Sequence, residues 1–131
     1  MLLDTSGLVC YFDRSDYRHQ EAEQIFRSAA SKVVHSYILA EFIPLCRSRR
    51  LDVGKALAFA RELLESEDVL VIWVDEPIHR AALTLLEARP DKTYSLCDAV
   101  SFVIMRLLGI TEALTTDRHF EQEGFTRLLE P

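Results

Sequence analysis

The run Val69-Leu-Val-Ile-Trp-Val74 restricts the fold of this 131-residue chain more than any other stretch. Its residues are mostly β-branched and apolar at successive positions, which predicts a strand with both faces covered. Such strands are typical of parallel sheets, because the crossover helices lie on both faces of the sheet. The run therefore predicts an α/β domain, and the chain is long enough for one domain with a single core.

Helical and strand-like segments alternate along the rest of the chain, as an α/β fold requires. Further short strands are expected at 1–4, 32–35, 110–114 and 125–129. Helices are expected at 7–12, 16–30, 36–47, 52–66, 77–88 and 95–109. Pro44 is expected to kink or shorten its helix, because proline removes a backbone N–H donor. No repeat or linker divides the chain, so we predict one domain over residues 1–131.

Composition and charge narrow the classes of function. The formal net charge is −6, which disfavours a simple DNA-binding module, because such modules are usually basic. A nuclease stays possible, since each divalent cation returns two positive charges. Cys10, Cys46 and Cys97 have no paired spacing and predict reduced thiols in a cytoplasmic protein, not a disulfide framework or a zinc site. We expect no secretory signal and no membrane-spanning segment.

Four acidic residues occupy related places in this predicted order of elements. Asp4 ends the first strand and Glu41 lies about one turn into the helix after the second strand. Asp98 is in the first turn of the 95–109 helix, and Asp117 follows the next strand. In a parallel sheet, ligands bind at the edge where the carboxyl ends of the strands meet. We therefore expect the four carboxylates to converge at that edge.

Each acid, taken alone, also has a purely structural explanation. Asp4 can cap the following helix or face water. Glu41 lies among apolar neighbours, where an acid either points outward or has a partner. Asp98 forms the pattern of a capping box with Ser95, and Asp117 stands where a helix N-cap would stand. These explanations stay open for each residue, but they leave the joint pattern of the four acids unexplained.

The joint pattern predicts a site for hard divalent cations. Two carboxylates about 5 Å apart repel by roughly 3 kcal/mol at an effective dielectric of about 20, so four could not all stay ionised without cations. Hydroxyl side chains, which add the oxygen donors that Mg²⁺ and Mn²⁺ prefer, accompany three of the acids. They belong to Thr5, Ser6, Ser95, Thr115 and Thr116, and Ser6 is also a candidate N-cap. Such a site favours metal-assisted hydrolysis of a phosphodiester.

The same elements resemble the PIN domain, and more closely the VapC-like ribonuclease toxins of bacterial toxin–antitoxin systems. The resemblance rests on Leu3-Asp4-Thr5-Ser6, Ala40-Glu41, Ser95-Leu-Cys-Asp98-Ala99 and Leu114-Thr-Thr-Asp117-Arg-His-Phe120, in this order. It implies a three-layer α/β/α fold with a central parallel sheet in strand order 3-2-1-4-5. It also implies Mg²⁺- or Mn²⁺-dependent cleavage of an RNA substrate, a homodimer and a neutralising antitoxin protein.

The resemblance also implies roles for individual residues. The core acids and the more variable fourth acid of the family correspond to Asp4, Glu41, Asp98 and Asp117, which we expect to be catalytic metal ligands. Supporting roles are expected for Thr5, Ser6 and Thr115. Contacts to RNA phosphates are expected for Arg47, Arg49, Arg50 and Arg118, although the first three could simply complement the negative end of their helix. Pro44, so soon after Glu41, departs from the family pattern and leaves the direction of that carboxylate open.

The rival hypothesis is a binding protein with this fold and no turnover, which would recruit a partner helix. The negative net charge favours this rival, and the ordered quartet of acids disfavours it. A phosphatase of the dehalogenase type is more distant, because Asp4 is followed by Thr5 and Ser6 where that class has a second aspartate. The sequence leaves the RNA target and the number of metal ions open.

Overall fold

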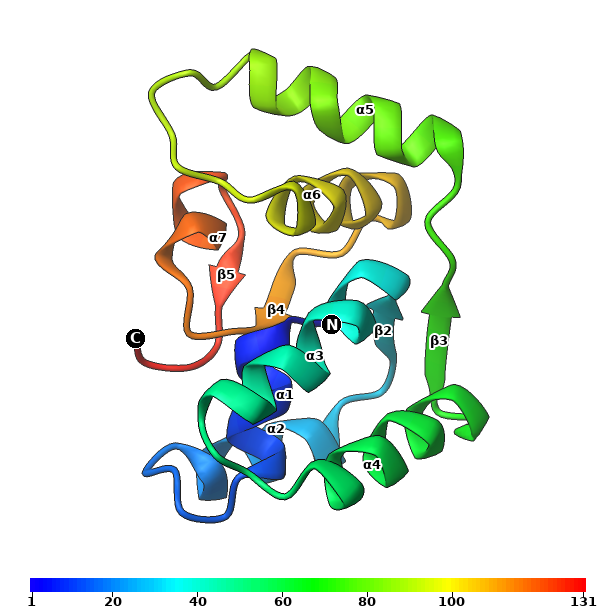
Figure 1. Ribbon diagram of the computed structural model, residues 1–131. Coiled ribbons are helices and arrows are strands. Elements are labelled where there is room, and N and C mark those ends of the chain that lie inside the picture. The colour runs from blue at the N-terminus through cyan, green and yellow to red at the C-terminus, as the bar shows by residue number, and fades with distance from the viewer.

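The structure, a computed structural model describing residues 1–131, has a five-stranded sheet with helices on both faces (Figure 1). The strands are β1 (Leu2–Leu3), β2 (Lys32–His35), β3 (Val69–Ile72), β4 (Glu112–Leu114) and β5 (Thr126–Arg127). All paired strands are parallel, and their order is β3-β2-β1-β4-β5. The predicted fold class and strand order are confirmed.

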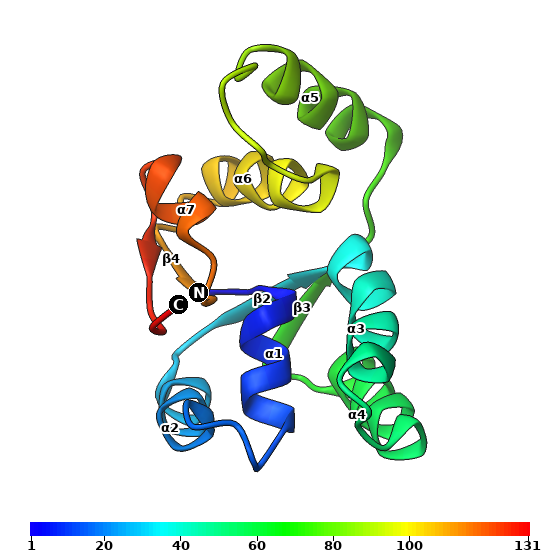
Figure 2. The ribbon, with the colours of Figure 1, turned by 60° about the vertical axis from the view of Figure 1, so that its left-hand side comes forward.

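The helices divide between the two faces of the sheet. They are α1 (Thr5–Phe12), α2 (His19–Ser28), α3 (Ser36–Ser48), α4 (Val53–Glu65), α5 (Glu76–Glu87), α6 (Leu96–Leu108) and α7 (Arg118–Gln122). Figure 2 shows α1 to α4 on one side and α5 to α7 on the other. This division follows from right-handed crossovers, because the chain reverses its direction across the sheet after β3. None of these helices combines the length and the apolar character that a bilayer-spanning segment needs.

The strand β3 corrects one expectation. Its apolar sequence predicted a strand covered on both faces, yet β3 is an edge strand of the sheet. Leu70 is 55% exposed and Trp73, just after the strand, is 66% exposed. The covered strands are β1 and β2, all of whose residues are buried. The parallel sheet was predicted correctly, but position in the sheet decides burial and cannot be read from one apolar run.

Several helix boundaries also differ from expectation, and α2 is shorter than the expected 16–30. Ser6 is not an N-cap, because α1 begins at Thr5 and Asp4 occupies the N-cap position. The hydroxyl of Ser6 instead contacts side chains at the end of the sheet. Pro44 does not shorten α3, which continues to Ser48. Pro44 leaves the carbonyl of Ala40 without a helical hydrogen-bond partner. Ala40 is exposed and lines a pocket, so this interruption lies on the open side of the helix.

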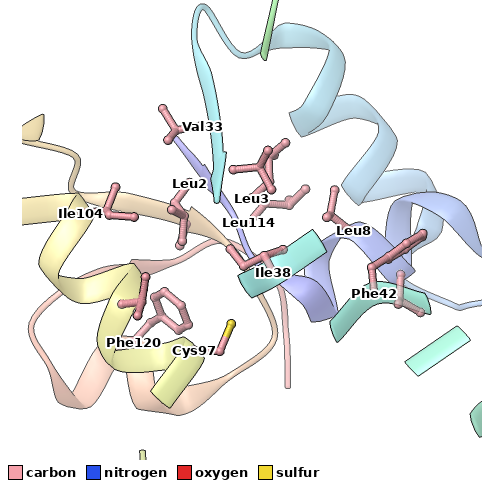
Figure 3. Packing of buried hydrophobic residues seen from close by; sticks show 14 of the residues in the cluster. Leu2, Leu3, Leu8, Val33, Ile38, Phe42, Cys97, Ile104, Leu114 and Phe120 are labelled. Carbon is pink, nitrogen blue, oxygen red and sulfur yellow. The ribbon is translucent and has the colours of Figure 1, made fainter. Parts of the chain in front are cut away.

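The core holds the first strand in the middle of the molecule. Leu2 and Leu3 are fully buried, and Figure 3 shows them packed among apolar residues from both layers of helices. Gly7 lets α1 lie directly against the end of β4, since an added Cβ would stand 1.9 Å from the carbonyl oxygen of Leu114. This close approach brings the residue after β1 next to the residue after β4.

Candidate active site

The carboxyl edge of the sheet opens into a pocket of about 820 Å³. One part of its lining consists of polar side chains, Asp4, Thr5, Ser6, Glu41, Thr93, Ser95, Asp98, Thr116, Asp117 and His119. One side of α3 supplies the rest, with Ala40, Pro44, Leu45 and Ser48. All four predicted acids therefore line one pocket, although they come from four separate segments of the chain. No lysine or arginine lines it.

Asp4 is the most enclosed of the four acids, with 6% of its surface exposed. Its Oδ2 accepts hydrogen bonds from Thr115 Oγ1 at 2.7 Å and from Ser6 Oγ at 3.3 Å. The pKa of Asp4 is raised to about 7, mostly by burial and also by the nearby carboxylates of Asp98 and Asp117, against the lowering effect of the Thr115 hydrogen bond. An ionised Asp4 is therefore unfavourable here unless positive charge arrives from outside the chain.

Glu41 is exposed, and it lines the pocket from α3. Thr5 Oγ1 donates a hydrogen bond to Glu41 Oε2 at 3.2 Å, which joins the start of α1 to α3. The two explanations left open for this acid are therefore both partly right, since it points outward but has a partner. Pro44 lines the same pocket one helical turn later and does not turn Glu41 away from it.

Asp98 combines a capping role with a place in the pocket. Ser95 Oγ accepts from the backbone N–H of Asp98 at 3.0 Å, and Asp98 Oδ2 accepts from the backbone N–H of Ser95 at 3.1 Å, so the capping box is complete. Asp98 is only 8% exposed. Burial raises the pKa of Asp98, and the charge of Asp117 acts in the same direction. The structural explanation and the predicted position are both correct.

Asp117 and His119 complete the polar side of the pocket. Asp117 is the N-cap of α7, and its Oδ1 accepts from the backbone N–H of His119 at 2.9 Å. His119 Nδ1 lies 3.1 Å from Asp98 Oδ2 and 3.2 Å from Asp117 Oδ1. One potential ligand atom from each of these three residues lies within 4.8 Å of the others. Sequence reasoning missed His119 as a site residue, although it falls inside the quoted run from Leu114 to Phe120.

The arginines predicted to contact RNA lie outside the pocket lining. Arg47, Arg49 and Arg50 are exposed around the end of α3, and Arg118 is exposed at the start of α7. Arg49 Nη1 lies 3.8 Å from Asp16 Oδ2, so Arg49 also forms an ion pair within the protein. Ser48, between Arg47 and Arg49, does line the pocket, which puts the arginines near its end.

The donor set fits a hard divalent cation. Carboxylate and hydroxyl oxygens are the ligands that Mg²⁺ and Mn²⁺ prefer, and the pocket offers four carboxylates with hydroxyls beside them. Burial, and after it the neighbouring acids, raise the pKa of Asp4 and of Asp98, which is the sign expected for enclosed acids without a compensating charge. A bound cation would compensate the negative charge of these carboxylates and favour their ionised form.

Comparison with known proteins identifies the family. The sequence model of the PIN-domain family matches residues 1–125 of this chain. The chain belongs to the PIN-domain family. This PIN domain is 31% identical over 129 residues to the 23S rRNA-specific endonuclease VapC20 of Mycobacterium tuberculosis, covering 98% of this chain and 97% of that protein. It is 33% identical over 122 residues to ribonuclease VapC26 of the same organism, covering 92% and 89% of the two chains.

The structural comparison agrees with the sequence comparison. The crystal structure of M. tuberculosis VapC20, described as a Sarcin-Ricin loop cleaving toxin, matches this PIN domain with a TM-score of 0.88 and 27% identity. The match covers 99% of this chain and 98% of that one. A VapC ribonuclease of Archaeoglobus fulgidus is 27% identical over 115 residues, covering 83% of this chain and 72% of that protein. The resemblance to VapC ribonucleases inferred from the motifs is confirmed.

Proposed function

We propose that this protein is a metal-dependent endoribonuclease that hydrolyses RNA phosphodiester bonds, and that it is the toxin of a toxin–antitoxin pair. The observation that carries the proposal is the meeting of Asp4, Glu41, Asp98 and Asp117 in one pocket without a lysine or arginine. The full-length similarity to VapC ribonucleases supports turnover. It disfavours the rival hypothesis of a binding protein without activity.

The four acids are assigned different roles in this proposal. Asp4 and Asp98 hold the principal ion, Glu41 holds it or orients the attacking water, and Asp117 acts through water or a second ion. Mg²⁺ or Mn²⁺ bound here would supply a water of lowered pKa and stabilise negative charge at phosphorus. Ser6 and Thr115 keep the Asp4 carboxylate in place, and Thr5 does the same for Glu41.

The RNA substrate is proposed to lie along the α3 side of the pocket. Arg47, Arg49, Arg50 and Arg118 would then meet phosphates on either side of the scissile bond. Phosphate contacts of this kind make binding weaken as salt concentration rises. Because a close relative acts on 23S rRNA, ribosomal RNA is the first substrate to test, beside transfer and messenger RNA.

The partners proposed for the protein are those of a toxin. We expect a homodimer in the cytoplasm and a neutralising antitoxin protein encoded beside it. Measuring the mass of the purified protein in solution tests the dimer. Co-expression with the neighbouring gene, followed by purification of a complex without ribonuclease activity, tests the antitoxin.

The decisive experiment is a cleavage assay on purified RNA with added Mg²⁺ or Mn²⁺ and with a chelator. Asp98→Asn should lower the cleavage rate more than about 100-fold. This is a larger effect than is usual for residues that only hydrogen-bond to metal ligands. Asp75→Asn is the matched control, because Asp75 is also an aspartate in a helix cap but lies outside the pocket. Cleavage that resists the chelator, or a fully active Asp98→Asn protein, would refute the proposal.

Thermal melting provides a test that needs no substrate. A cation that binds only the folded protein stabilises it by about 2.7 kcal/mol at about a hundredfold excess over the dissociation constant. We expect Mn²⁺ to raise the melting temperature of the wild type and of Asp75→Asn, but not that of Asp98→Asn. A wild-type melting temperature unchanged by millimolar Mn²⁺ would favour the binding protein without turnover.

A further inference from the structure

We propose that His119 is a positioning residue that orients the carboxylates of Asp98 and Asp117, and that Thr93 and Tyr94 hold its ring in the place that this requires. The inference rests on the proposed function and deepens it, because it concerns the same pocket. It differs from a role for His119 as a metal ligand, which the 4.8 Å grouping of its ring with Asp98 and Asp117 would otherwise suggest.

One ring nitrogen faces both acids. His119 Nδ1 is 3.1 Å from Asp98 Oδ2 and 3.2 Å from Asp117 Oδ1. Ionised carboxylate oxygens only accept hydrogen bonds, so a nitrogen that bonds to them must carry a hydrogen. The geometry therefore selects the form of the ring with hydrogen on Nδ1. In that form Nδ1 has no free lone pair to offer a cation.

The opposite side of the ring shows how it is held in place. His119 Nε2 lies 2.9 Å from Thr93 Oγ1. When Nδ1 of a neutral ring carries the hydrogen, Nε2 is an acceptor and the Thr93 hydroxyl donates to it. Tyr94, the next residue, packs edge-on against the ring, with centroids 5.3 Å apart and an interplanar angle of 67°. The segment between α5 and α6 thus fixes the position of the His119 ring, while the two carboxylates that face Nδ1 select its tautomer.

The consequence is a choice of which carboxylate oxygen faces a cation. Asp98 Oδ2 accepts from both the backbone of Ser95 and the ring of His119, so it is fully occupied. Asp117 Oδ1 accepts from the backbone N–H of His119 and lies beside its ring. The remaining oxygens, Asp98 Oδ1 and Asp117 Oδ2, are left to serve as ligands. Groups that orient metal ligands in this way typically change metal affinity by roughly 10- to 100-fold.

The test compares Mg²⁺ and Mn²⁺ affinities, measured by calorimetry, in a set of variants. His119→Leu removes the donor and should weaken binding of both cations by a similar factor of about 10 or more. His119→Asn can place an amide N–H close to the position of Nδ1 and should keep most of the affinity. Thr93→Val should fall between these two. His79→Asn is the control, because His79 is a partly buried histidine that bonds to a hydroxyl, that of Tyr37, away from the pocket.

A second readout concerns the ring itself. Nitrogen NMR of the metal-free wild type should show hydrogen on Nδ1 of His119. Circular dichroism of each variant checks that it is folded. A wild-type ring with hydrogen on Nε2, or unchanged metal affinity in folded His119→Leu, would overturn the proposal.

Two further outcomes distinguish a failure of the positioning role from a failure of the proposed ribonuclease function. If His119→Leu weakens Mn²⁺ binding far more than Mg²⁺ binding, His119 is a nitrogen ligand and the positioning role is wrong, because Mg²⁺ is a hard cation that is bound through oxygen ligands. If the wild type binds Mn²⁺ with the expected pattern across the variants but never cleaves RNA, the positioning role stands and the nuclease assignment fails.

Discussion

Asp4 and Glu123 are nearly equally withdrawn from water, at 6% and 8% exposed, but their surroundings are opposite. Glu123 is enclosed by Arg106 Nη2 at 2.6 Å, Arg89 Nε at 3.1 Å and the hydroxyl of Tyr94 at 3.1 Å. Burial alone would raise the pKa of Glu123, but these hydrogen bonds bring it below its ordinary value. Asp4 has hydroxyl groups and other acids around it, and its pKa is raised to about 7.

The difference teaches how to tell a structural acid from one prepared for a ligand. The fold can neutralise a buried carboxylate, since it brings arginines from two segments to Glu123. At the pocket it supplies no such cation. Buried charges are tolerated when they are paired, and Asp4 is left to find its partner outside the chain. The three predictions below either remove this contrast or measure it.

The strongest way to break the contrast is to supply the pocket with its own cation. Ala40→Lys places an ammonium group on the exposed side of α3, next to Glu41. It should raise the melting temperature of the metal-free protein at about pH 8 and abolish the effect of Mn²⁺ on melting. Cleavage should fall more than about 10³-fold, because the ammonium competes with the cation that the proposed hydrolysis needs.

The control for this variant is Ala58→Lys, since Ala58 is exposed on another helix, α4, and lies outside the pocket. It should leave both melting and cleavage unchanged. An Ala40→Lys protein that is less stable than wild type without metal would mean that the acids do not repel one another as inferred.

The contrast also predicts how the stability of the metal-free protein depends on pH. A carboxyl whose pKa is higher in the folded than in the unfolded state stabilises the fold at low pH, and this contribution is lost as pH rises through the folded-state value. For Asp4 the loss runs from about pH 4 to about pH 7. Between about pH 5 and pH 8 the free energy of unfolding should fall by up to about 2.7 kcal/mol, since a tenfold change in proton affinity equals about 1.4 kcal/mol.

Chemical denaturation of wild type and Asp4→Asn, both in chelator, measures this effect. The amide cannot ionise, so the variant should lose most of the decline and be the more stable protein at about pH 8. Asp98 contributes in the same direction as Asp4, so a smaller decline should persist in the variant. Glu123 and Asp16, whose pKa values are lowered, act only at more acidic pH. Parallel curves for the two proteins would show that Asp4 carries no unfavourable charge.

Local signals account for the parts of the site that sequence could predict. Acids that directly follow a strand, such as Asp4, mark the carboxyl edge of a parallel sheet wherever the strands lie within it. The capping box of Ser95 and Asp98 is also local, because its two residues are three apart and bond to each other's backbone. These features depend on neighbours in sequence, so they can be predicted without knowledge of the tertiary structure.

The parts that sequence could not predict depend on contacts between distant segments. The ring of His119 meets Thr93, which is 26 residues away, and no periodicity relates the two. The edge position of β3 follows from the order of strands and not from its own composition. Ser6 has the sequence signature of an N-cap, but its hydroxyl is taken by Asp4 and Thr115, which tertiary packing brings beside it. In each case a long-range contact overrides a local preference.

The smallest expected effect concerns the structural side of the contrast. Glu123→Gln keeps the shape of the side chain but removes its charge, and charge-assisted hydrogen bonds contribute about 1.5–3 kcal/mol each to stability. We expect denaturation to show a loss of about 2 kcal/mol, because Arg89 and Arg106 are partly exposed and regain water. The variant should keep the Mn²⁺-dependent rise in melting temperature, since no arginine of this cluster lines the pocket. Near room temperature, where the variant is still folded, it should also keep most of the cleavage rate. If Glu123→Gln instead abolished metal binding while remaining folded, the arginine-paired acid would belong to the site, and pairing with arginine could no longer separate structural from functional carboxylates in this fold.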